Sequence, residues 1–297
     1  WARPCIALAC ALPPLVRPSG HGEEWERSYR VALRVAQELQ AKPAEAQLNV
    51  ELSILRYLAG DDRASVRHTE DALAAYRMAG DRAGEARSLN NLGALYHKLG
   101  RLPEAMGAYE AGLALARRIG HRRYQAYATA NLAAMRRDLG RLGEAVDLDL
   151  VAIALFRDIG DRHGQADATD DLALAHRAAG RHDEALAAHR AALGIVRDLT
   201  DRPREGRILR ELATTLVQAG DAGHAVTVLR QSLSVFAQAG DRYGEAHARR
   251  QLGAALQVLG DREEAARCWR EALSIFTELG TPEAAEIRLE LGSLPPG

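Results

Sequence analysis

The sequence predicts an all-α fold, an α-solenoid of tandem helix-turn-helix repeats, and three observations carry that prediction. Glycine recurs every 40 residues, at Gly60, Gly100, Gly140, Gly180, Gly220 and Gly260. A second series lies halfway between these positions, at Gly80, Gly120, Gly160, Gly240 and Gly280, with Thr200 in the gap. Within each half, apolar residues recur at helical spacing, as in Leu89, Leu92, Leu95 and Leu99. A unit of two amphipathic helices repeated at a fixed period is typical of a solenoid.

Each 20-residue half carries its own signals for ending one helix and starting the next. A glycine just past a helix end can adopt the left-handed conformation that satisfies the last carbonyl groups. An aspartate can cap the free N–H groups of the next helix, and Asp81, Asp161, Asp201 and Asp241 follow the second glycine series. Glutamates in the first turn are favourable to the helix dipole. We therefore expect fourteen to fifteen helices and no sheet.

Small and bulky residues alternate at fixed repeat positions. Small residues share two positions, namely Gly93, Ala133, Ala173, Ala213 and Gly253 at one, and Ala105, Ala145, Ala185, Ala225 and Ala265 at the other. Bulky residues share a third position, with Tyr76, Phe156, Phe236 and Phe276. This pattern predicts close packing of paired helices around aromatic side chains.

The composition excludes several classes of protein. The 297 residues are 47% hydrophobic and 27% charged, and no apolar run approaches the roughly 18 residues that span a bilayer. Three cysteines without a CxxC motif indicate neither a disulfide scaffold nor a zinc site, which favours a reducing, cytoplasmic location. The net charge of −1 provides no general attraction to nucleic acid or to a membrane surface. We therefore expect no membrane partner and no direct nucleic-acid partner.

Candidate catalytic and metal-binding groups are few. His182 and His189 lie seven residues apart, but no third ligand is evident, and His189 occupies the repeat position of Tyr109 and Trp269, which favours a packing role. Asp167, Asp170 and Asp171 invite an acid/base interpretation but are better explained as a solvated or salt-bridged face. The chain has no HExxH, nucleophile elbow or glycine-rich phosphate loop. The sequence thus predicts a protein that is not an enzyme and needs no cofactor.

One motif relates the repeats to a known family. The pattern L-G-x-x-Y-x-x-x-G-x-x-x-E-A is present as Leu92, Gly93, Tyr96, Gly100, Glu104 and Ala105 and resembles the tetratricopeptide repeat (TPR). The 40-residue form, with G-D-R-x-G-E-A at 80–86 and 240–246, is similar to the repeats of the Leu-Gly-Asn protein and kinesin light chain. The resemblance implies a right-handed α-solenoid whose concave wall is lined by the first helix of each pair and binds a protein or peptide segment.

The ends of the chain suggest its organisation. We expect a degenerate N-terminal repeat over 1–40, six 40-residue TPR units over 41–280, and a C-terminal capping helix and tail over 281–297. The segment HGEEWERSYRVAL (21–33) resembles the start of the repeat region in bacterial signal-transduction NTPases of the NB-ARC/STAND type and related antibiotic-pathway regulators. In that family the repeats form a C-terminal sensor behind a nucleotide-binding domain. The chain lacks G-x-x-x-x-G-K-[ST] and a helix-turn-helix DNA-binding motif, so it corresponds at most to the sensor, with a nucleotide-binding domain upstream in a full-length protein.

The resemblance also places particular side chains on the groove. These are Arg87, Asn90, Asn91, His97, Lys98, Tyr127, Asn131, Arg137, Asp138, Asp167, Asp170, Asp171, Arg177, Arg207, Arg210, Glu211, Thr214, His247, Arg250 and Gln251. Three of the four asparagines fall in this set, and an amide can both donate and accept a hydrogen bond to a ligand backbone. In kinesin light chain and similar repeats, asparagine at the position of Asn91 and Asn131 has that role. The alternative is that these asparagines bond neighbouring helices.

The groove charges alternate along the repeats. Basic residues near Arg87 are followed by the three aspartates, and these are followed by Arg207, Arg210 and Arg250. The second basic stretch could receive acidic side chains or a terminal carboxylate of a partner. Alternatively, Arg207 and Arg210 are neutralised by the aspartates one repeat away. All but two of the 39 basic residues are arginine, so no single arginine is strong evidence for a site.

Two functions remain open from the sequence. The first is a partner-binding or ligand-sensing module of a bacterial signalling or transcriptional regulatory protein. The second is an architectural solenoid that forms homo-oligomers without a discrete groove ligand. An apolar end formed by Trp1, Cys5, Ile6, Leu8 and Leu12 would favour the second.

Overall fold

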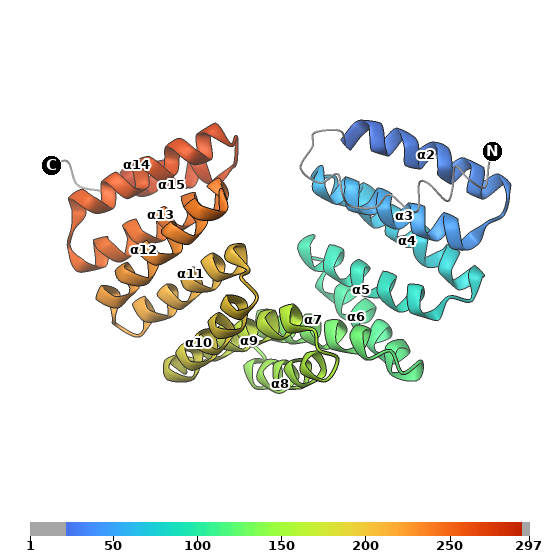
Figure 1. Cartoon of the computed structure of the whole chain (residues 1–297), viewed down its shortest axis with the longest axis horizontal. Coiled ribbons are helices and arrows are strands. Elements are labelled where there is room, and N and C mark those ends of the chain that lie inside the picture. Colours follow the sequence, from blue (N-terminus) through green and yellow to red (C-terminus); the bar gives the residue numbers. More distant parts are fainter. Residues whose placement is uncertain (1–21, 293–297) are drawn as a thin grey trace. The chain divides into compact units, whose positions relative to one another are not determined.

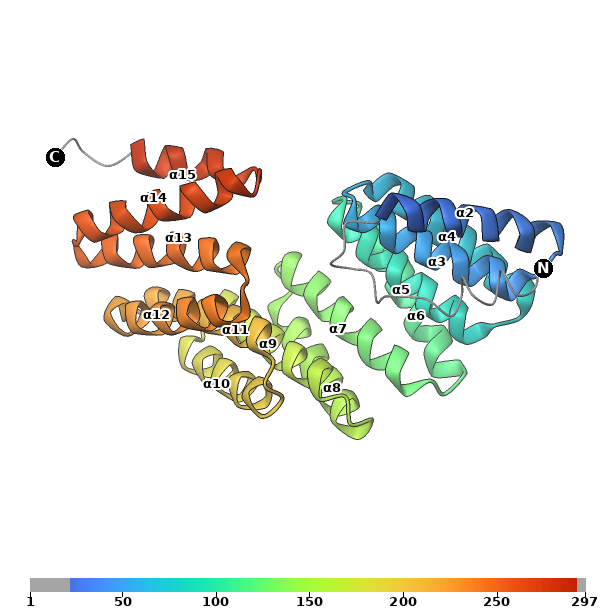
Figure 2. The ribbon, with the colours of Figure 1, turned by 45° about the horizontal axis from the view of Figure 1, so that its top comes forward.

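The computed structural model describes residues 22–292 and is built from helices only (Figures 1 and 2). The helices are α2 (Gly22–Glu38), α3 (Lys42–Leu58), α4 (Asp62–Ala79), α5 (Arg82–Lys98), α6 (Leu102–Arg118), α7 (Arg122–Asp138), α8 (Leu142–Asp158), α9 (Arg162–Ala178), α10 (His182–Asp198), α11 (Arg202–Gln218), α12 (Ala222–Ala239), α13 (Arg242–Leu259), α14 (Arg262–Glu278) and α15 (Glu283–Gly292). Within 22–292 there are fourteen helices and no strand, which confirms the predicted all-α repeat fold. Residues 1–21 of the expected degenerate N-terminal repeat, which include the apolar end at Trp1–Leu12, lie outside the described residues.

The helix boundaries follow the predicted signals. Gly80 ends α4 with φ 72°, and the other glycines of both series also have positive φ, between 67° and 85°. Thr200 adopts φ 54° where the second series lacks its glycine. The Asp81 side chain accepts a hydrogen bond from the Gly84 N–H at 2.9 Å, and Asp161, Asp201 and Asp241 cap α9, α11 and α13 in the same way. The signals that end one helix and start the next therefore act locally, within each repeat.

The small repeat positions make room for aromatic rings. A Cβ atom added at Gly93 would lie 2.5 Å from the Tyr109 ring, and one at Gly253 would lie 2.5 Å from the Trp269 ring. Tyr109 and Trp269 are themselves buried. Small residues therefore pack against aromatic rings, but Gly93 and Gly253 face a different ring position from the predicted one, whose Tyr76 and Phe156 rings pack against Gly84 and Gly164.

The chain divides into two compact units. The N-terminal unit spans 1–139 and the C-terminal unit spans 140–297. In both units the two helices of a repeat pack against each other, as α5 does against α6 and α11 against α12. First helices of successive repeats also contact one another, namely α5 with α7 in the N-terminal unit and α11 with both α9 and α13 in the C-terminal unit. This second contact places α5 beside α7 in the N-terminal unit and α9, α11 and α13 side by side in the C-terminal unit.

No helix in the described part of the chain is both long enough and apolar enough to cross a bilayer.

Candidate functional site

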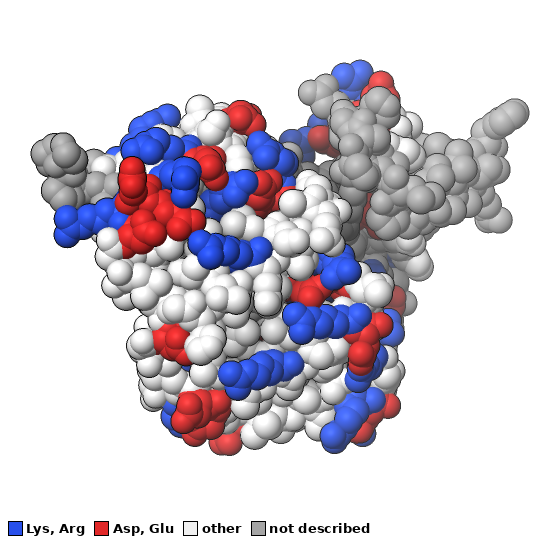
Figure 3. All heavy atoms as spheres, turned by 60° about the vertical axis from the view of Figure 1, so that its left-hand side comes forward, with Lys and Arg blue, Asp and Glu red and all other residues white. Residues whose placement is uncertain are grey.

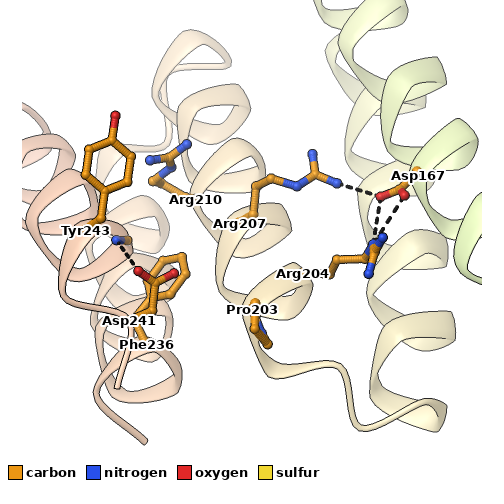
Figure 4. Close-up of a pocket in the computed structure, with 9 residues that line it drawn as sticks. Asp167, Pro203, Arg204, Arg207, Arg210, Phe236, Asp241 and Tyr243 are labelled. Carbon is orange, nitrogen blue, oxygen red and sulfur yellow. Dashed lines mark hydrogen bonds and ion pairs between the residues drawn. The ribbon is translucent and has the colours of Figure 1, made fainter. Parts of the chain in front are cut away.

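In the C-terminal unit, the face of first helices α9, α11 and α13 contains a pocket of about 480 Å³ (Figure 4). Its lining residues come from α9, from the first half of α11, from the end of α12 and from the start of α13. They are Asp167, Pro203, Arg204, Arg207, Arg210, Phe236, Asp241, Tyr243 and Gly244. Three of them, Asp167, Arg207 and Arg210, belong to the predicted groove set.

Asp167 lies on one side of this pocket and is shared by two arginines of α11. Arg204 Nε lies 3.1 and 3.2 Å from the two Asp167 carboxylate oxygens, and Arg207 Nη2 lies 2.9 Å from Oδ1. Arg204 also donates from Nη1 to Asp201 Oδ2 at 2.6 Å. These ion pairs show that Arg207 is neutralised from the preceding repeat, as the alternative interpretation of the charge pattern predicted.

Asp170 lies beneath this surface, where its side chain is 1% exposed. Its Oδ2 accepts from Arg207 Nη1 at 2.7 Å, and its Oδ1 lies 2.8 Å from Nδ1 of the fully buried His189. His189 Nε2 in turn lies 3.1 Å from Thr215 Oγ1. The structure thus places Asp170 in the core rather than on the groove surface, because a buried histidine on the second helix α10 is available to pair with it. The packing role predicted for His189 is confirmed.

Arg210 differs from its neighbours because it lacks a close carboxylate. Its side chain is 19% exposed, and its ion pair with Glu211 is long, at 3.7 Å. The same Glu211 carboxylate pairs with Arg177 at 2.9 Å, and Arg210 Nε is buried without an acceptor. Burial lowers the pKa of Arg210, and the nearby Arg207 adds to that effect against the raising influence of Glu211. Figure 4 shows the Arg210 guanidinium between Arg207 and Tyr243.

Two aromatic residues form the opposite side of the pocket. Phe236 is held between two glycines, since a Cβ at Gly206 or at Gly244 would come within 2.6 Å of its ring. Tyr243 is 46% exposed, and its hydroxyl donates to Glu283 Oε1 at 2.6 Å. This hydrogen bond to a carboxylate raises the pKa of Tyr243 above its ordinary value. The aromatic wall is therefore fixed by packing on one ring and by α15 on the other.

The C-terminal helix α15 takes up the remaining basic groove residues. Arg250 pairs through Nη1 with Glu286 at 2.7 Å and donates from Nε to Glu290 at 2.9 Å. His247 is half-buried against Tyr243 and Phe276, with Nε2 3.8 Å from Glu283. Arg250 and His247 thus face carboxylates of α15. Among the predicted basic residues Arg207, Arg210 and Arg250, Arg210 is the one without a close carboxylate. On the side of the molecule that Figure 3 shows, acidic and basic side chains are interspersed.

The N-terminal unit brings together the other predicted residues. Asn131 Nδ2 in α7 donates to Asn90 Oδ1 in α5 at 2.9 Å, so this pair links neighbouring helices. Arg87 donates to the Tyr76 hydroxyl at 2.5 Å. Asn91 is half-exposed and makes no hydrogen bond within the described residues. Its amide is therefore available to a ligand.

The other predicted residues of the N-terminal unit interact mainly with charged partners at the surface. Lys98 donates to Asp62 at 2.8 Å and lies 4.3 Å from the centroid of the Tyr57 ring. His97 Nε2 lies 2.8 Å from Asp138 Oδ2, and Arg137 Nε lies 3.7 Å from the same carboxylate. Tyr127 is 39% exposed, and in the C-terminal unit Asp171 is half-exposed. The predicted residues are therefore found in two sets, one in each unit.

Sequence reasoning missed Arg204, Phe236 and Tyr243 as part of a site. Arg204 carries a usable signal, because the equivalent positions in three other repeats are Gly84, Gly164 and Gly244. Phe236 was assigned to packing, and the structure shows that its ring serves both packing and the pocket wall. Within residues 22–292, no three His, Cys, Asp or Glu side chains are placed to hold a metal ion.

Comparisons with known proteins agree with the repeat pattern. Two family models described as tetratricopeptide repeat match the chain, one at residues 124–198 and 165–238 and the other at 86–119 and 246–279. No curated protein matches the chain by sequence. These family matches confirm the predicted resemblance.

Solved structures share the fold. The nearly identical TPR-like repeats assigned to a kinesin light chain of Podosopora anserina match with a TM-score of 0.56 and 21% identity over 65% of this chain and 95% of that one. A Signal Transduction ATPase with Numerous Domains (STAND) protein with a tetratricopeptide repeat sensor, from Pyrococcus horikoshii, matches with a TM-score of 0.68 and 14% identity over 92% of this chain and 45% of that one. The Rap conjugation gene regulator of the plasmid pLS20, in complex with the Phr* peptide, matches with a TM-score of 0.61 and 13% identity over 86% and 75%.

Proposed function

We propose, from the premise that this chain belongs to the tetratricopeptide repeat family, that it binds a protein or peptide segment along its first helices. The observation that carries the proposal is the pocket between α9, α11 and α13, which combines an incompletely paired arginine with an aromatic wall. Small concave sites with a few placed polar groups on apolar walls are typical of ligand pockets. We call the half-exposed residues Asp167, Arg207, Arg210 and Thr214, together with Tyr243, the first-helix wall.

The N-terminal unit supports the same proposal with different chemistry. The half-exposed Asn91 amide keeps both its donor and its acceptor, so it can bond an extended backbone irrespective of its side chains. Asn131 Nδ2 already donates to Asn90 Oδ1, so the Asn90 Nδ2 donor and the Asn131 Oδ1 acceptor are not used in this bond. Each unit therefore presents polar groups on its first helices that its own fold does not fully use.

The wider role is proposed by analogy with the solved relatives. One of them is a gene regulator in complex with a peptide, and another is a STAND protein in which tetratricopeptide repeats are the sensor. We propose that this chain is likewise the ligand-sensing or partner-binding region of a bacterial regulatory protein. It would act in the cytoplasm by binding rather than catalysis, with six repeats over 41–280 between a degenerate repeat and a capping helix. The nucleotide-binding domain expected upstream belongs to the same proposal.

The proposal is tested by blocking the wall with a bulky side chain. Thr214 lies on the first-helix wall of α11, and Thr227 is exposed on the second helix α12. Both hydroxyls donate to the carbonyl four residues earlier, at 3.2 and 3.4 Å, so the two positions are locally matched. Thr214→Trp and Thr227→Trp are therefore a test variant and its control.

A displayed random-peptide library is screened against the full chain, and the enriched peptides are titrated into both variants. We expect Thr214→Trp to weaken binding by about tenfold or more, because the bulky indole covers part of the first-helix wall. Thr227→Trp should keep the wild-type affinity. Equal loss in both variants, or in neither, would remove the first-helix wall as the binding site.

A further inference from the structure

We infer that the turn joining α6 to α7, in the N-terminal unit, is a docking surface for an acidic segment of another protein. Its cations are the exposed Arg117, Arg118, Arg122 and Arg123, and we call this set the basic turn. The pocket described above belongs to the other unit, and the inference does not depend on the proposed function.

The basic turn departs from the other turns that join one repeat to the next. Residues 117–123 contain four arginines, one histidine and no acidic residue. Each equivalent turn has at least one Asp or Glu and at most two arginines or lysines, and these turns are 37–43, 77–83, 157–163, 197–203, 237–243 and 277–283. The repeat therefore supplies its own comparison, and the abundance of arginine in the chain does not explain the excess.

Two of the other turns show which group the repeat places between such cations. In the α4–α5 turn, the buried Glu85 accepts hydrogen bonds from Arg77 at 2.9 Å and from Arg82 at 2.7 Å. The α10–α11 turn has the same arrangement around Glu205, with distances of 2.7 and 2.8 Å. In both turns, two exposed arginines thus hold one carboxylate of the following helix.

The basic turn has the two arginines without the carboxylate. Arg117 and Arg122 occupy the two arginine positions, whereas Gln125 occupies the carboxylate position. The Gln125 side-chain amide donates to the Ala116 carbonyl at 3.1 Å. Arg117 makes no ion pair or side-chain hydrogen bond within the described residues, so the carboxylate that the repeat normally gives it is missing.

Arg118 replaces a second acid of the repeat. In the C-terminal unit, this position is Asp198 or Glu278, and each pairs with the arginine that begins the first helix of the same repeat, at 3.1 and 3.2 Å. The equivalent arginine in the N-terminal unit is Arg82, so two like charges replace an ion pair. Arg118 and Arg123 have no ionic partner within the part of the chain that the structure describes.

The number and extent of the charges indicate the kind of partner. Three cations without a partner, in a turn that lacks any acid, favour a ligand with several negative charges over a single anion. The basic surface does not continue into the α4–α5 turn, because Glu85 neutralises both arginines there. A nucleic-acid backbone commonly needs cations for about six to ten phosphates. A short run of Asp or Glu on a partner protein matches this smaller surface.

The inference is tested by adding the full chain to a fluorescein-labelled hexaglutamate peptide at low salt and measuring fluorescence anisotropy. Hexaglutamine is the uncharged control probe, and a six-nucleotide oligouridylate presents a nucleic-acid backbone. We expect hexaglutamate to bind, hexaglutamine not to bind and oligouridylate to bind more weakly than hexaglutamate. Because the arginines are exposed, the affinity should fall as salt is added.

The double variant Arg117→Gln, Arg118→Gln should weaken hexaglutamate binding by about threefold or more, since each exposed ion pair contributes little alone. The double variant Arg190→Gln, Arg270→Gln changes the net charge equally, at exposed positions of α10 and α14, and should keep the wild-type affinity. Thr214→Trp should also keep it, which separates the basic turn from the first-helix wall.

A second variant fills the missing position rather than removing cations. Gln125→Glu gives the basic turn the internal carboxylate of the α4–α5 turn, so it should weaken hexaglutamate binding without lowering the midpoint of thermal unfolding. Loss of binding in this variant is then not a loss of the fold. Gln165→Glu makes the same substitution in the α8–α9 turn, which already contains two aspartates, and should bind as the wild type does.

An absence of hexaglutamate binding overturns the inference, as does wild-type affinity in the basic-turn variants or an equal loss in their controls. Loss of hexaglutamate binding in Thr214→Trp would place the acidic peptide on the first-helix wall instead. Tighter binding of oligouridylate than of hexaglutamate would assign the basic turn to nucleic acid and overturn the protein partner. Each of these results leaves the library test of the proposed function unaffected.

Discussion

His189 in α10 and Asp170 in α9 form a fully buried pair, with 2.8 Å between Nδ1 and Oδ1. Arg207 bonds the other oxygen of the same carboxylate at 2.7 Å and lines the pocket, so this pair connects the core of the repeat to the first-helix wall. The stability of the C-terminal unit and the geometry of its proposed binding site therefore share one carboxylate.

Removing that carboxylate should be costly. Asp170→Ala leaves a buried histidine nitrogen and one arginine nitrogen without their acceptor, and we expect the free energy of unfolding to fall by about 3 kcal/mol. Asp171→Ala, at a half-exposed position next to it, should cost less than about 1 kcal/mol. Urea unfolding of both variants measures the difference. Similar losses in the free energy of unfolding would show that the buried pair contributes no more to stability than the half-exposed Asp171 does.

The two asparagines of the predicted amide position should behave differently. Asn131→Ala removes the hydrogen bond to Asn90 and should lower the free energy of unfolding by about 1 kcal/mol. Asn91→Ala removes no hydrogen bond of the fold and should leave stability unchanged within about 0.5 kcal/mol. Chemical denaturation checks the stability, and peptide titration checks whether Asn91→Ala weakens binding. A larger stability loss for Asn91 than for Asn131 would contradict this division.

Glycine substitutions should test the aromatic packing of the pocket wall. A Cβ at Gly206 would lie 2.6 Å from the Phe236 ring, whereas a Cβ at Gly194, within α10, meets nothing within 4 Å. We expect Gly206→Ala to destabilise the chain by about 1–3 kcal/mol. Gly194→Ala should stabilise it by about 0.5–1 kcal/mol, because alanine loses less backbone entropy in a helix. If the midpoint of thermal unfolding rises in both variants, Phe236 is not held in this way.

The fold was largely predictable because its determinants repeat. The glycine that ends a helix and the aspartate that caps the next one act within a few residues, so Gly80 and Asp81 could be recognised without tertiary information. Gly93 could be recognised from its recurrence as a small residue, although its contact with the Tyr109 ring became visible only in the structure. Six copies in register made these local signals strong.

The site was less predictable because it depends on pairings across repeats. The sequence placed Asp170 and Arg250 on the groove, but it could not show that His189, 19 residues away, and Glu290, 40 residues away, would pair with them. Such pairings depend on small rotations of each helix about its axis. In the sequence, Arg207 and Arg210 are two similar arginines on the same predicted helix. Only the structure shows that Arg207 is paired with an aspartate and that Arg210 is incompletely paired.

Acid should destabilise the C-terminal unit through His247. Burial lowers the pKa of His247 below its ordinary value of 6.5, and Arg210 and Arg250 add to that effect against Glu283 and Asp241. The folded state therefore binds this proton less readily than the unfolded state does. The resulting stabilisation is present above pH 6.5 and is lost as the pH falls through 6.5 towards the folded value.

His247→Gln removes this titration and keeps a polar side chain, while His68 and His176 still titrate in both proteins. We expect the midpoint of thermal unfolding to fall more in the wild type than in the variant between about pH 7.5 and about pH 5.5. An identical fall in the two proteins would exclude a contribution from His247.

Hydrogen–deuterium exchange on the full chain, with and without the tightest library peptide, tests the central claim of binding along the first helices most directly. A ligand that binds only the folded state slows local opening of the elements it contacts. The account predicts slower exchange in α9, α11 and the start of α13, with little change in α10, α12 and α14, and no such effect in Thr214→Trp. Protection confined to the second helices, or protection that persists in Thr214→Trp, would contradict it.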